Sequence, residues 1–430
     1  MNTAGGGICI ERSICILLSS FAIGGYLLFL SERAINVPYH DDILDVLGFL
    51  SRFAEAAPLQ ERLTILFEQY NDHRTAASRV VYLLLLKVRG QIDFRELCLL
   101  ANFLVLGLVA LYAAVTIPGR RLGATAIAVL LLCQPRGSDF LVWPMAVLAF
   151  QGVIFYGFAA LLALRELRPW RFSLAVLAGG FAMFSLSSGQ LVWVAGTASL
   201  LYSFRRSERH AAVYLALWLL AGIGFIAFFH HGFHNPSPLG RLLDFAVADP
   251  ANHLAYFLAM LGSATAFGQL PAAILAGATL LSLLVMLSRR GLRQGFGVPV
   301  FFAWYLVLGM AIITMGRAPY SLMNYALEPR YSVFSSNLVA AMAVLAVSMA
   351  RRRIAVLGIV IAVVYCVLSY RYYTPAVDAV LRARAKAYDT GNFWVFGFPM
   401  EQTNRIVAKA VRHGFYAPPA RPLEVPLSDD

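Results

Sequence analysis

The residues best suited to chemistry form an acidic pair, Asp41-Asp42, which follows the first apolar segment of the chain. A carboxylate within hydrogen-bond reach of a hydroxyl can act as a general base, and two carboxylates together can help to hold a divalent cation. The alternative is structural, because one Asp can cap the helix that begins here while the other complements its dipole. We favour the catalytic interpretation because a second polar motif follows in the same loop.

That second motif is Asn71-Asp72-His73-Arg74. Arginine and histidine donate hydrogen bonds to phosphate oxygens, so His73 and Arg74 are predicted to contact an anion such as the phosphate of a lipid head group. A polar helix end exposed to water is the alternative interpretation.

Two arginines flank a later polar loop, Arg317 before it and Arg330 after it. We predict that both bind the same phosphate, and a helix that begins near Arg330 would direct its positive dipole at the anion. The alternative is anchoring at the membrane surface by arginine and tyrosine side chains. The predicted substrate-binding residues, which adjoin these motifs in the chain, are His40, Asp72 and Tyr331.

The composition points to a membrane as the surroundings of these motifs. Of the 430 residues, 60% are hydrophobic and 13% are charged, whereas a soluble domain is nearer half apolar and a quarter charged. The net charge of +12 does not indicate nucleic acid, because the arginines occur in short clusters between apolar segments. His230, His231 and His234 lie where a helix is expected to end, so no metal site is predicted there.

Apolar segments long enough to cross a bilayer, or nearly so, predict an all-α, polytopic protein of about eleven transmembrane helices. The predicted spans are 13–31, 95–117, 122–134, 144–164, 172–186, 190–203, 211–229, 269–288, 297–315, 331–349 and 354–371.

Short arginine clusters occupy alternate connections between these spans, which is typical of the cytoplasmic face. The clusters include Arg120-Arg121, Arg205-Arg206 and Arg351-Arg352-Arg353. This alternation requires that 172–203 cross the membrane twice. It predicts a multi-pass protein of a bacterial inner membrane, with a cytoplasmic N-terminus and a periplasmic C-terminus.

The predicted organisation is a transmembrane domain, 1–371, followed by a periplasmic tail, 372–430. Within the first part, 32–94 is a long periplasmic loop whose apolar residues recur at helical spacing. We expect helices near 43–53, 59–70 and 80–88 that lie in the plane of the membrane surface.

This arrangement resembles the GT-C superfamily of integral-membrane glycosyltransferases. The shared features are the acidic pair in the loop after the first span, the surface helices, and many spans with short inner loops. The chain also resembles a set of uncharacterised bacterial membrane proteins that carry an Asn-x-His-Arg element in this loop, here at 71–74, and the Gly316-Arg317 and Arg330-Tyr331 pairs are similar too. The paired acid is similar to that of lipid-phosphate arabinofuranosyltransferases. The chain departs from other members in having no isolated Asp-x-Asp motif and no large C-terminal domain.

The resemblance implies inverting transfer of a sugar, with arabinofuranose as one candidate, from a polyprenyl phosphate to a periplasmic acceptor. The acceptor would be a protein such as a pilin, a glycan or a glycolipid, and Asp41 or Asp42 would be the base. The resemblance fixes no cofactor, and the need for a divalent cation stays open. The expected partners are the lipid-linked sugar, the acceptor and membrane lipids, without nucleic acid.

Two other classes of function remain open at this stage. A lipid or small-molecule transporter or flippase would carry ionisable residues within its spans and inverted repeats, neither of which is evident. An O-antigen polymerase or ligase would depend on arginine and histidine of later outer loops rather than on an acidic pair after the first span.

Overall fold

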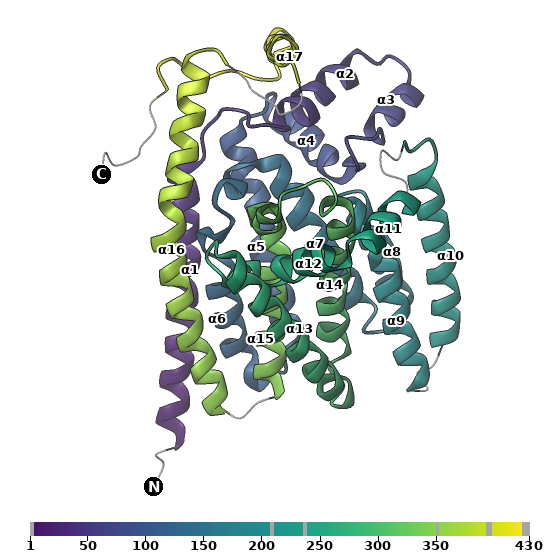
Figure 1. Ribbon diagram of the computed structural model, residues 1–430, viewed down its shortest axis with the longest axis vertical. Coiled ribbons are helices and arrows are strands. Elements are labelled where there is room, and N and C mark those ends of the chain that lie inside the picture. Colours follow the sequence, from purple (N-terminus) through teal and green to yellow (C-terminus); the bar gives the residue numbers. More distant parts are fainter. Residues whose placement is uncertain (1–3, 207–209, 235–238, 350–351, 393–397, 424–430) are drawn as a thin grey trace.

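The computed structural model describes residues 4–206, 210–234, 239–349, 352–392 and 398–423, and within these ranges the chain forms helices and no β-strand. Long helices lie side by side in a bundle (Figure 1). Four shorter ones, α2 (Phe49–Glu55), α3 (Leu59–Leu66), α4 (Ala76–Arg89) and α17 (Met400–Arg412), gather at the end where α16 finishes. We call this the outer end, and the end where α1 begins the inner end.

Each of the eleven predicted spans coincides with a helix. These helices are α1 (Ala4–Arg33), α5 (Phe94–Val115), α6 (Arg121–Leu132), α7 (Pro144–Ala163), α8 (Pro169–Met183), α9 (Leu191–Arg205), α10 (Ala211–His230), α13 (Leu270–Arg293), α14 (Gly297–Arg317), α15 (Pro329–Met349) and α16 (Arg352–Asp389). Eight helices of the described chain are long and apolar enough to cross a membrane. The number becomes nine if Pro118–Leu132 and Pro135–Val142, bent by 60°, form one broken span. The all-α, multi-pass architecture is confirmed, whereas the count of eleven stays a prediction.

The helices α8 and α9, with 15 residues each, are among the short members of this set, together with the 12-residue α6. The turn η4 (Ser187–Gln190) between them lies at the outer end, where Ser187 contacts His73. Their far ends meet again, since Arg165 before α8 and Arg206 after α9 line the same hollow. The two helices therefore form a hairpin, which agrees with the double crossing that the arginine pattern requires.

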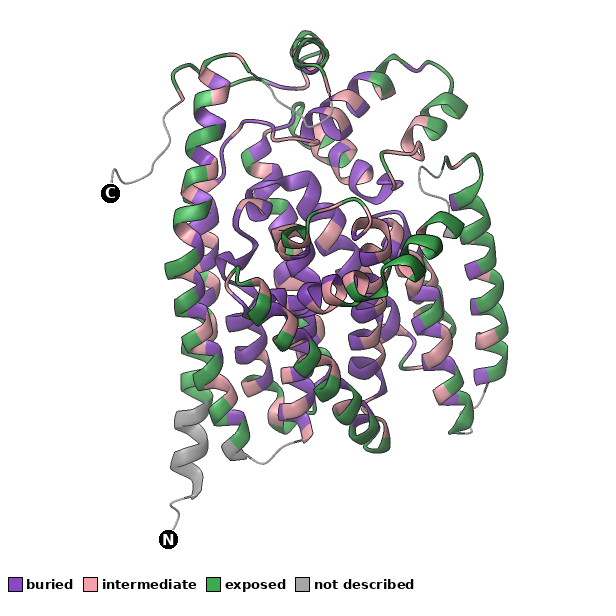
Figure 2. Ribbon diagram, in the orientation of Figure 1, coloured by how far each residue is buried: buried purple, intermediate pink, exposed green. Residues whose placement is uncertain are grey.

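The centre of the bundle is formed by α7 and α15, whose apolar segments are each 72% buried (Figure 2). In α10 and in α13 only 17% of the apolar segment is buried, so these helices present most of their apolar side chains to the surroundings. Apolar surface on that scale fits contact with lipid. Between α10 and α13 the chain forms α11 (Leu239–Ala248) and α12 (Pro250–Gly262), and η6 (Met323–Leu327) connects α14 to α15.

The first outer loop begins with a π-helical segment, η1 (Asp42–Gly48), which continues into α2. The helix expected over 59–70 ends earlier, at Leu66. The reason is a buried arginine: Arg79 Nη1 donates to the carbonyls of Ile65, Leu66 and Glu68 and so holds the chain in a turn after the helix.

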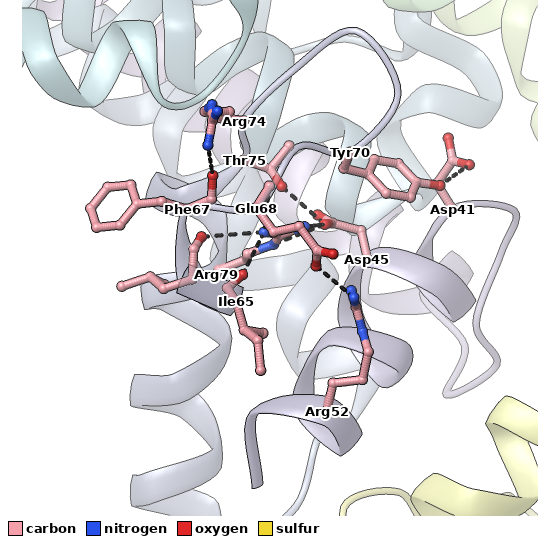
Figure 3. Close-up of polar contacts among 11 residues, drawn as sticks. Asp41, Asp45, Arg52, Ile65, Phe67, Glu68, Tyr70, Arg74, Thr75 and Arg79 are labelled. Carbon is pink, nitrogen blue, oxygen red and sulfur yellow. Dashed lines mark hydrogen bonds and ion pairs between the residues drawn. The ribbon is translucent and has the colours of Figure 1, made fainter. Parts of the chain in front are cut away.

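Arg79 also forms a buried ion pair with Asp45 of η1 (Figure 3). Nη2 and Nε of Arg79 donate to Oδ1 of Asp45 at 2.8 and 3.1 Å, and Thr75 Oγ1 donates to the same oxygen at 2.9 Å. The two charged side chains are at most 1% exposed. One guanidinium therefore joins η1, the end of α3 and the start of α4.

A second buried arginine, Arg384, fixes the start of the loop. It donates to the carbonyl of Val37 at 2.6 Å and to that of Val142 at 2.8 Å, and its guanidinium lies 4.6 Å from the Tyr39 ring centroid. Arg384 belongs to α16, which has 38 residues and continues without a break across position 371. A helix of that length measures about 57 Å, longer than a hydrocarbon core of about 30 Å, so the predicted tail begins as an extension of the last span.

Because Arg79 is buried, its replacement by methionine leaves Asp45 charged and unpaired and also frees three carbonyls. We expect a loss of about 3–5 kcal/mol in the free energy of unfolding. Arg52, paired with Glu68 at the surface with 46% and 40% of the side chains exposed, is the matched control, for which the loss should stay below about 1 kcal/mol. Thermal and denaturant unfolding in detergent measure both, and equal losses would contradict the role assigned to Arg79.

Candidate functional site

The two carboxylates of the acidic pair have different environments. Asp42 has no exposed surface, and both of its oxygens accept backbone hydrogen bonds, Oδ2 from Tyr39 N and Oδ1 from Met145 N, each at 3.0 Å. Burial raises the pKa of Asp42 to about 7, although these hydrogen bonds oppose the shift. Asp42 therefore joins the loop to the first turn of α7, with both oxygens already occupied.

Asp41 is partly exposed, and only one of its oxygens has a partner. Oδ1 accepts a hydrogen bond of 2.6 Å from the Tyr70 hydroxyl, while Oδ2 accepts none from the residues that the structure describes (Figure 3). Burial raises the pKa of Asp41, and the hydrogen bond from Tyr70 and the charge of Arg330 act in the opposite direction. Of the two acids, Asp41 is the one that can take a proton from another molecule.

The Tyr70 side chain comes from a tight turn that contains the second polar motif. The N–H of Tyr70 donates to the carbonyl of His73 at 2.8 Å, and the N–H of His73 donates to the carbonyl of Tyr70 at 2.9 Å. Asn71, inside the turn, has a φ of +48°, a conformation that asparagine adopts more readily than most residues. The turn therefore presents Tyr70 and His73 at fixed positions.

Left-handed backbone at non-glycine residues recurs around this cluster. His40, directly before Asp41, has a φ of +47°, and Ser138, directly before Asp139, has a φ of +39°. Such conformations cost free energy and concentrate at functional sites. The π-helical turn after Asp41 is a second feature of that kind.

The His40 ring lies against aromatic rings at the start of the loop, with centroid distances of 4.0 Å to Tyr39 and 5.3 Å to Trp143. Burial lowers the pKa of His40 to about 4, and the charges of Arg384 and Arg330 lower it further. His40 is therefore neutral at pH 7.

His73 is oriented by Ser187 of η4. The Nδ1 atom lies 2.9 Å from Ser187 Oγ and accepts from Ser187 N at 3.3 Å, and Ser187 Oγ also donates to the carbonyl of Asp72. Burial lowers the pKa of His73 to about 4, so its ring is neutral at pH 7. Because Nδ1 accepts the hydrogen bond from Ser187 N, the proton of the neutral ring is on Nε2, which can donate to a ligand.

A cavity of about 240 Å³ adjoins this histidine. Its polar lining residues are Asp72, His73, Ser187, Ser188, Gln190, His230 and Arg317. Its apolar lining residues include Phe150, Leu186, Phe229, Phe233, Leu242, Ile312 and Ile313. Tyr331 also lines it. A cavity that combines both kinds of wall fits an amphiphile better than a sugar or an ion alone.

Arg330 has the arrangement expected of an anion-binding residue. Its buried Nε has no hydrogen-bond partner among the described residues, and its guanidinium lies 5.2 Å from the Tyr331 ring centroid. Its charge lowers the pKa values of Asp41 and Glu328, both of which burial raises. An arginine held close to carboxylates without a direct ion pair keeps its donors for a ligand.

Arg317 lies at the edge of the cavity, 3.5 Å from Asp72 Oδ2, and both side chains are nearly half exposed. Exposed pairs of this kind are weak, so a bound anion can compete for the arginine. Its position beside His73 agrees with the predicted phosphate contact, which stays a prediction.

Arg74, the fourth residue predicted to bind phosphate, has another role in this fold. Its guanidinium donates to three backbone carbonyls, those of Phe229 at 2.8 Å, His231 at 2.6 Å and Phe67. These bonds hold the end of α10 against the first outer loop. Arg74 is buried, its Nε, Nη1 and Nη2 each donate to a backbone carbonyl, and it does not line the cavity beside His73, so we leave it out of the candidate phosphate site.

On the other side of the turn lies a groove of about 520 Å³, which is lined by both polar and apolar residues and bordered by α17. Tyr70 and Asn71 line this groove, whereas Asp72 and His73 line the cavity, so the turn separates the two spaces. The other lining residues of the groove are Leu44, Gly48, Ser51, Arg52, Glu68, Gln69, Phe398, Gln402, Ile406 and Lys409.

The acidic pair does not present a ligand set for a cation. Asp42 uses both oxygens on backbone N–H groups, which leaves Asp41 as the free member. No group of three His, Cys, Asp or Glu side chains suited to a metal occurs in the part of the chain that the structure describes. The cation interpretation of the pair gains no support from this geometry.

Three contributors to the site were not identified from the sequence: Tyr70, Ser187 and Arg384. Tyr70 immediately precedes the Asn71–Arg74 motif, at the end of a segment, 59–70, whose spacing predicts a helix. Ser187 lies in the turn between the predicted spans 172–186 and 190–203, and a serine in such a turn carries no signal of its own. Arg384 is a basic residue in a helical tail, and nothing in its local sequence shows that it packs against residues 37 and 142.

The different environments of the two acids predict different effects of the same substitution. In Asp42→Asn, one backbone N–H must face the new amide group, so we expect a loss of about 1–3 kcal/mol of stability. Asp41→Asn should leave the unfolding temperature close to that of the wild type, because Tyr70 can still donate to the amide oxygen. Unfolding in detergent compares the two, and a larger loss for Asp41→Asn would contradict the assignment.

The hydrogen bond from Tyr70 favours the ionised form of Asp41, so Tyr70→Phe should raise the pKa of Asp41 further. Asp41 would then stay protonated up to a higher pH than in the wild type. Infrared difference spectroscopy, with Asp41→Asn used to identify the carboxyl band, follows this ionisation. A midpoint that stays in place or moves to lower pH would show that the hydroxyl does not stabilise the carboxylate.

Comparison of this chain with protein-family models, with curated proteins and with solved structures finds no match in any of the three. The functional interpretation therefore depends on the residues and geometry described above.

Proposed function

We propose that this protein is a membrane glycosyltransferase that moves a sugar from a polyprenyl phosphate to an acceptor at the outer end of the bundle. The observation that carries the proposal is that Arg330, whose Nε has no described partner, acts electrostatically on Asp41, whose Oδ2 accepts no described hydrogen bond. One group is suited to a leaving phosphate and the other to a general base.

The cavity beside His73 is the proposed donor site. Its apolar wall suits the first isoprenoid units, and its polar wall suits the phosphate and the sugar. Arg317, Arg330 and the neutral His73 would donate to the phosphate oxygens, where negative charge grows as the bond to the sugar breaks. Tyr331 would lie beside the bound lipid.

The groove beneath α17 is the proposed acceptor site, because Tyr70, the hydrogen-bond partner of Asp41, lines it on the side of the turn opposite the donor cavity. The acceptor hydroxyl would transfer its proton to Asp41, and its oxygen would form a bond to the anomeric carbon. The bond from that carbon to the phosphate oxygen would break, releasing polyprenyl phosphate. A single displacement of this kind inverts the anomeric configuration.

The position of the polar cluster supports transfer over transport. Asp41, His73 and Arg330 lie at the outer end, and a transporter would place its substrate site near the middle of the membrane. This proposal places the outer end at the periplasm of a bacterial inner membrane, consistent with the arginine clusters of the inner end.

The direct test is mass spectrometry of lipids that co-purify with the wild-type protein and with Asp41→Asn. We expect a glycosylated polyprenyl phosphate to accumulate on the variant, because the donor still binds while the acceptor is no longer deprotonated. Glu61→Gln, at an exposed position of α3, is the control and should match the wild type. Absence of polyprenyl lipid from all three proteins would favour a transporter, and wild-type turnover by Asp41→Asn would favour a polymerase or ligase that uses other residues.

Loss of the phosphate contacts should lower donor binding itself. Arg330→Gln and Arg317→Gln are expected to reduce the amount of bound polyprenyl phosphate, each by about tenfold, since a hydrogen bond to a charged group contributes about 1.5 kcal/mol or more. Arg405→Gln, in an exposed pair on α17, removes the same charge outside the site and serves as the control. If all three variants retained the same amount of polyprenyl phosphate, the phosphate would bind at another site.

A further inference from the structure

A second polar hollow, of about 580 Å³, lies at the inner end of the bundle and has no part in the proposed transfer. It is formed where separate connections meet, those around Arg121, Arg165, Arg206 and Gly295. In the sequence these arginines indicate only which connections face the cytoplasm. The fold brings three of them, from connections that are far apart in the chain, to the wall of one hollow.

The hollow carries an excess of positive charge. Arg121, Arg165 and Arg206 are exposed and line it, and its described lining residues include no aspartate or glutamate. The nearest acid in sequence to Arg165 is Glu166, which pairs with Arg171 at 3.0 Å and with Arg168 at 3.6 Å. That carboxylate is thus engaged by other arginines.

Backbone groups add to this positive field. The helices α6 and α14 both begin at the hollow, at Arg121 and Gly297, and neither has a side-chain cap at its N-terminus. The first-turn N–H groups of a helix favour a bound anion. Gly295, with a φ of +85°, lets the chain turn sharply just before α14.

One arginine is already positioned for binding. Arg206 Nη1 donates to the Tyr202 hydroxyl at 2.8 Å, and that hydroxyl donates to the carbonyl of Leu292 at 2.7 Å. This chain of hydrogen bonds fixes Arg206 and Tyr202 at the wall of the hollow, so less conformational freedom is lost when a ligand binds.

We propose that this hollow binds the phosphodiester head group of an anionic phospholipid. Basic pockets between spans on the cytoplasmic side are suited to such head groups. Apolar residues, among them Val115, Ile117 and Val298, also line the hollow, and they would contact the start of the acyl chains. This assignment does not depend on the reaction at the outer end.

The test measures binding of phosphatidylglycerol to the full-length protein in detergent, by native mass spectrometry and by the shift of the unfolding temperature. Phosphatidylcholine and inorganic phosphate are the comparison ligands. The combined variant Arg121→Gln with Arg165→Gln should weaken phosphatidylglycerol binding about 30-fold, from two charges lost near the head group. Arg289→Gln with Arg290→Gln removes two exposed arginines of the same end outside the hollow, and should bind as the wild type does.

Each outcome decides the proposal. Selective binding of phosphatidylglycerol by the wild type and the control, lost in the Arg121 and Arg165 variant, supports it. Equal binding of phosphatidylcholine, or equal loss in both double variants, overturns the site. Stabilisation by inorganic phosphate alone, without phosphatidylglycerol, would show that the hollow takes a soluble anion rather than a lipid head group.

Discussion

The buried guanidinium of Arg79 is the interaction on which the outer end of this protein depends. A charge removed from water is costly unless it is paired and its donors are satisfied. Arg79 meets both conditions, with Asp45 as counter-ion and the carbonyls of residues 65, 66 and 68 as acceptors (Figure 3). Because those partners lie on η1, at the end of α3 and beside α4, satisfying one side chain fixes three segments together. The turn that carries Tyr70 and His73 comes directly after Glu68 in the chain, so Arg79 also fixes where this turn begins.

Arginines perform two distinct tasks in this end of the bundle, and their partners distinguish the tasks. Arg74, Arg79 and Arg384 are buried and donate to backbone carbonyls, so they hold loops to helices. Arg317 and Arg330 have few or weak partners and lie beside the amphipathic cavity or the free acid. The first group supplies rigidity, and the second group keeps donors for an anion, a division that preorganisation of a polar site requires.

The two acids of the pair follow the same division. Asp42 accepts a hydrogen bond from Met145 of α7 and so joins the loop to that helix. This contact holds the neighbouring Asp41 at a defined position, where only its Oδ1 accepts a described hydrogen bond. Left-handed backbone at His40 and Asn71 is the cost of that arrangement, and the buried arginines on either side offset it. A site of this construction supports a reaction between an amphiphile and a polar partner that approach from opposite sides of one turn.

Periodicity and composition were sufficient to predict the helices of the bundle, because a bilayer demands long apolar segments and arginine clusters mark one face. They also selected Asp41, His73, Arg317 and Arg330 as candidate site residues, whose types are unusual for their apolar surroundings. They did not separate Asp41 from Asp42, nor Arg74 from Arg330, because adjacent or similar residues have the same local pattern. Only tertiary contacts decided these roles, since Met145, which donates to Asp42, and Phe229, which accepts from Arg74, each lie more than a hundred residues away in the chain. The convergence of inner arginines on one hollow likewise depends on helix packing, which sequence spacing does not encode.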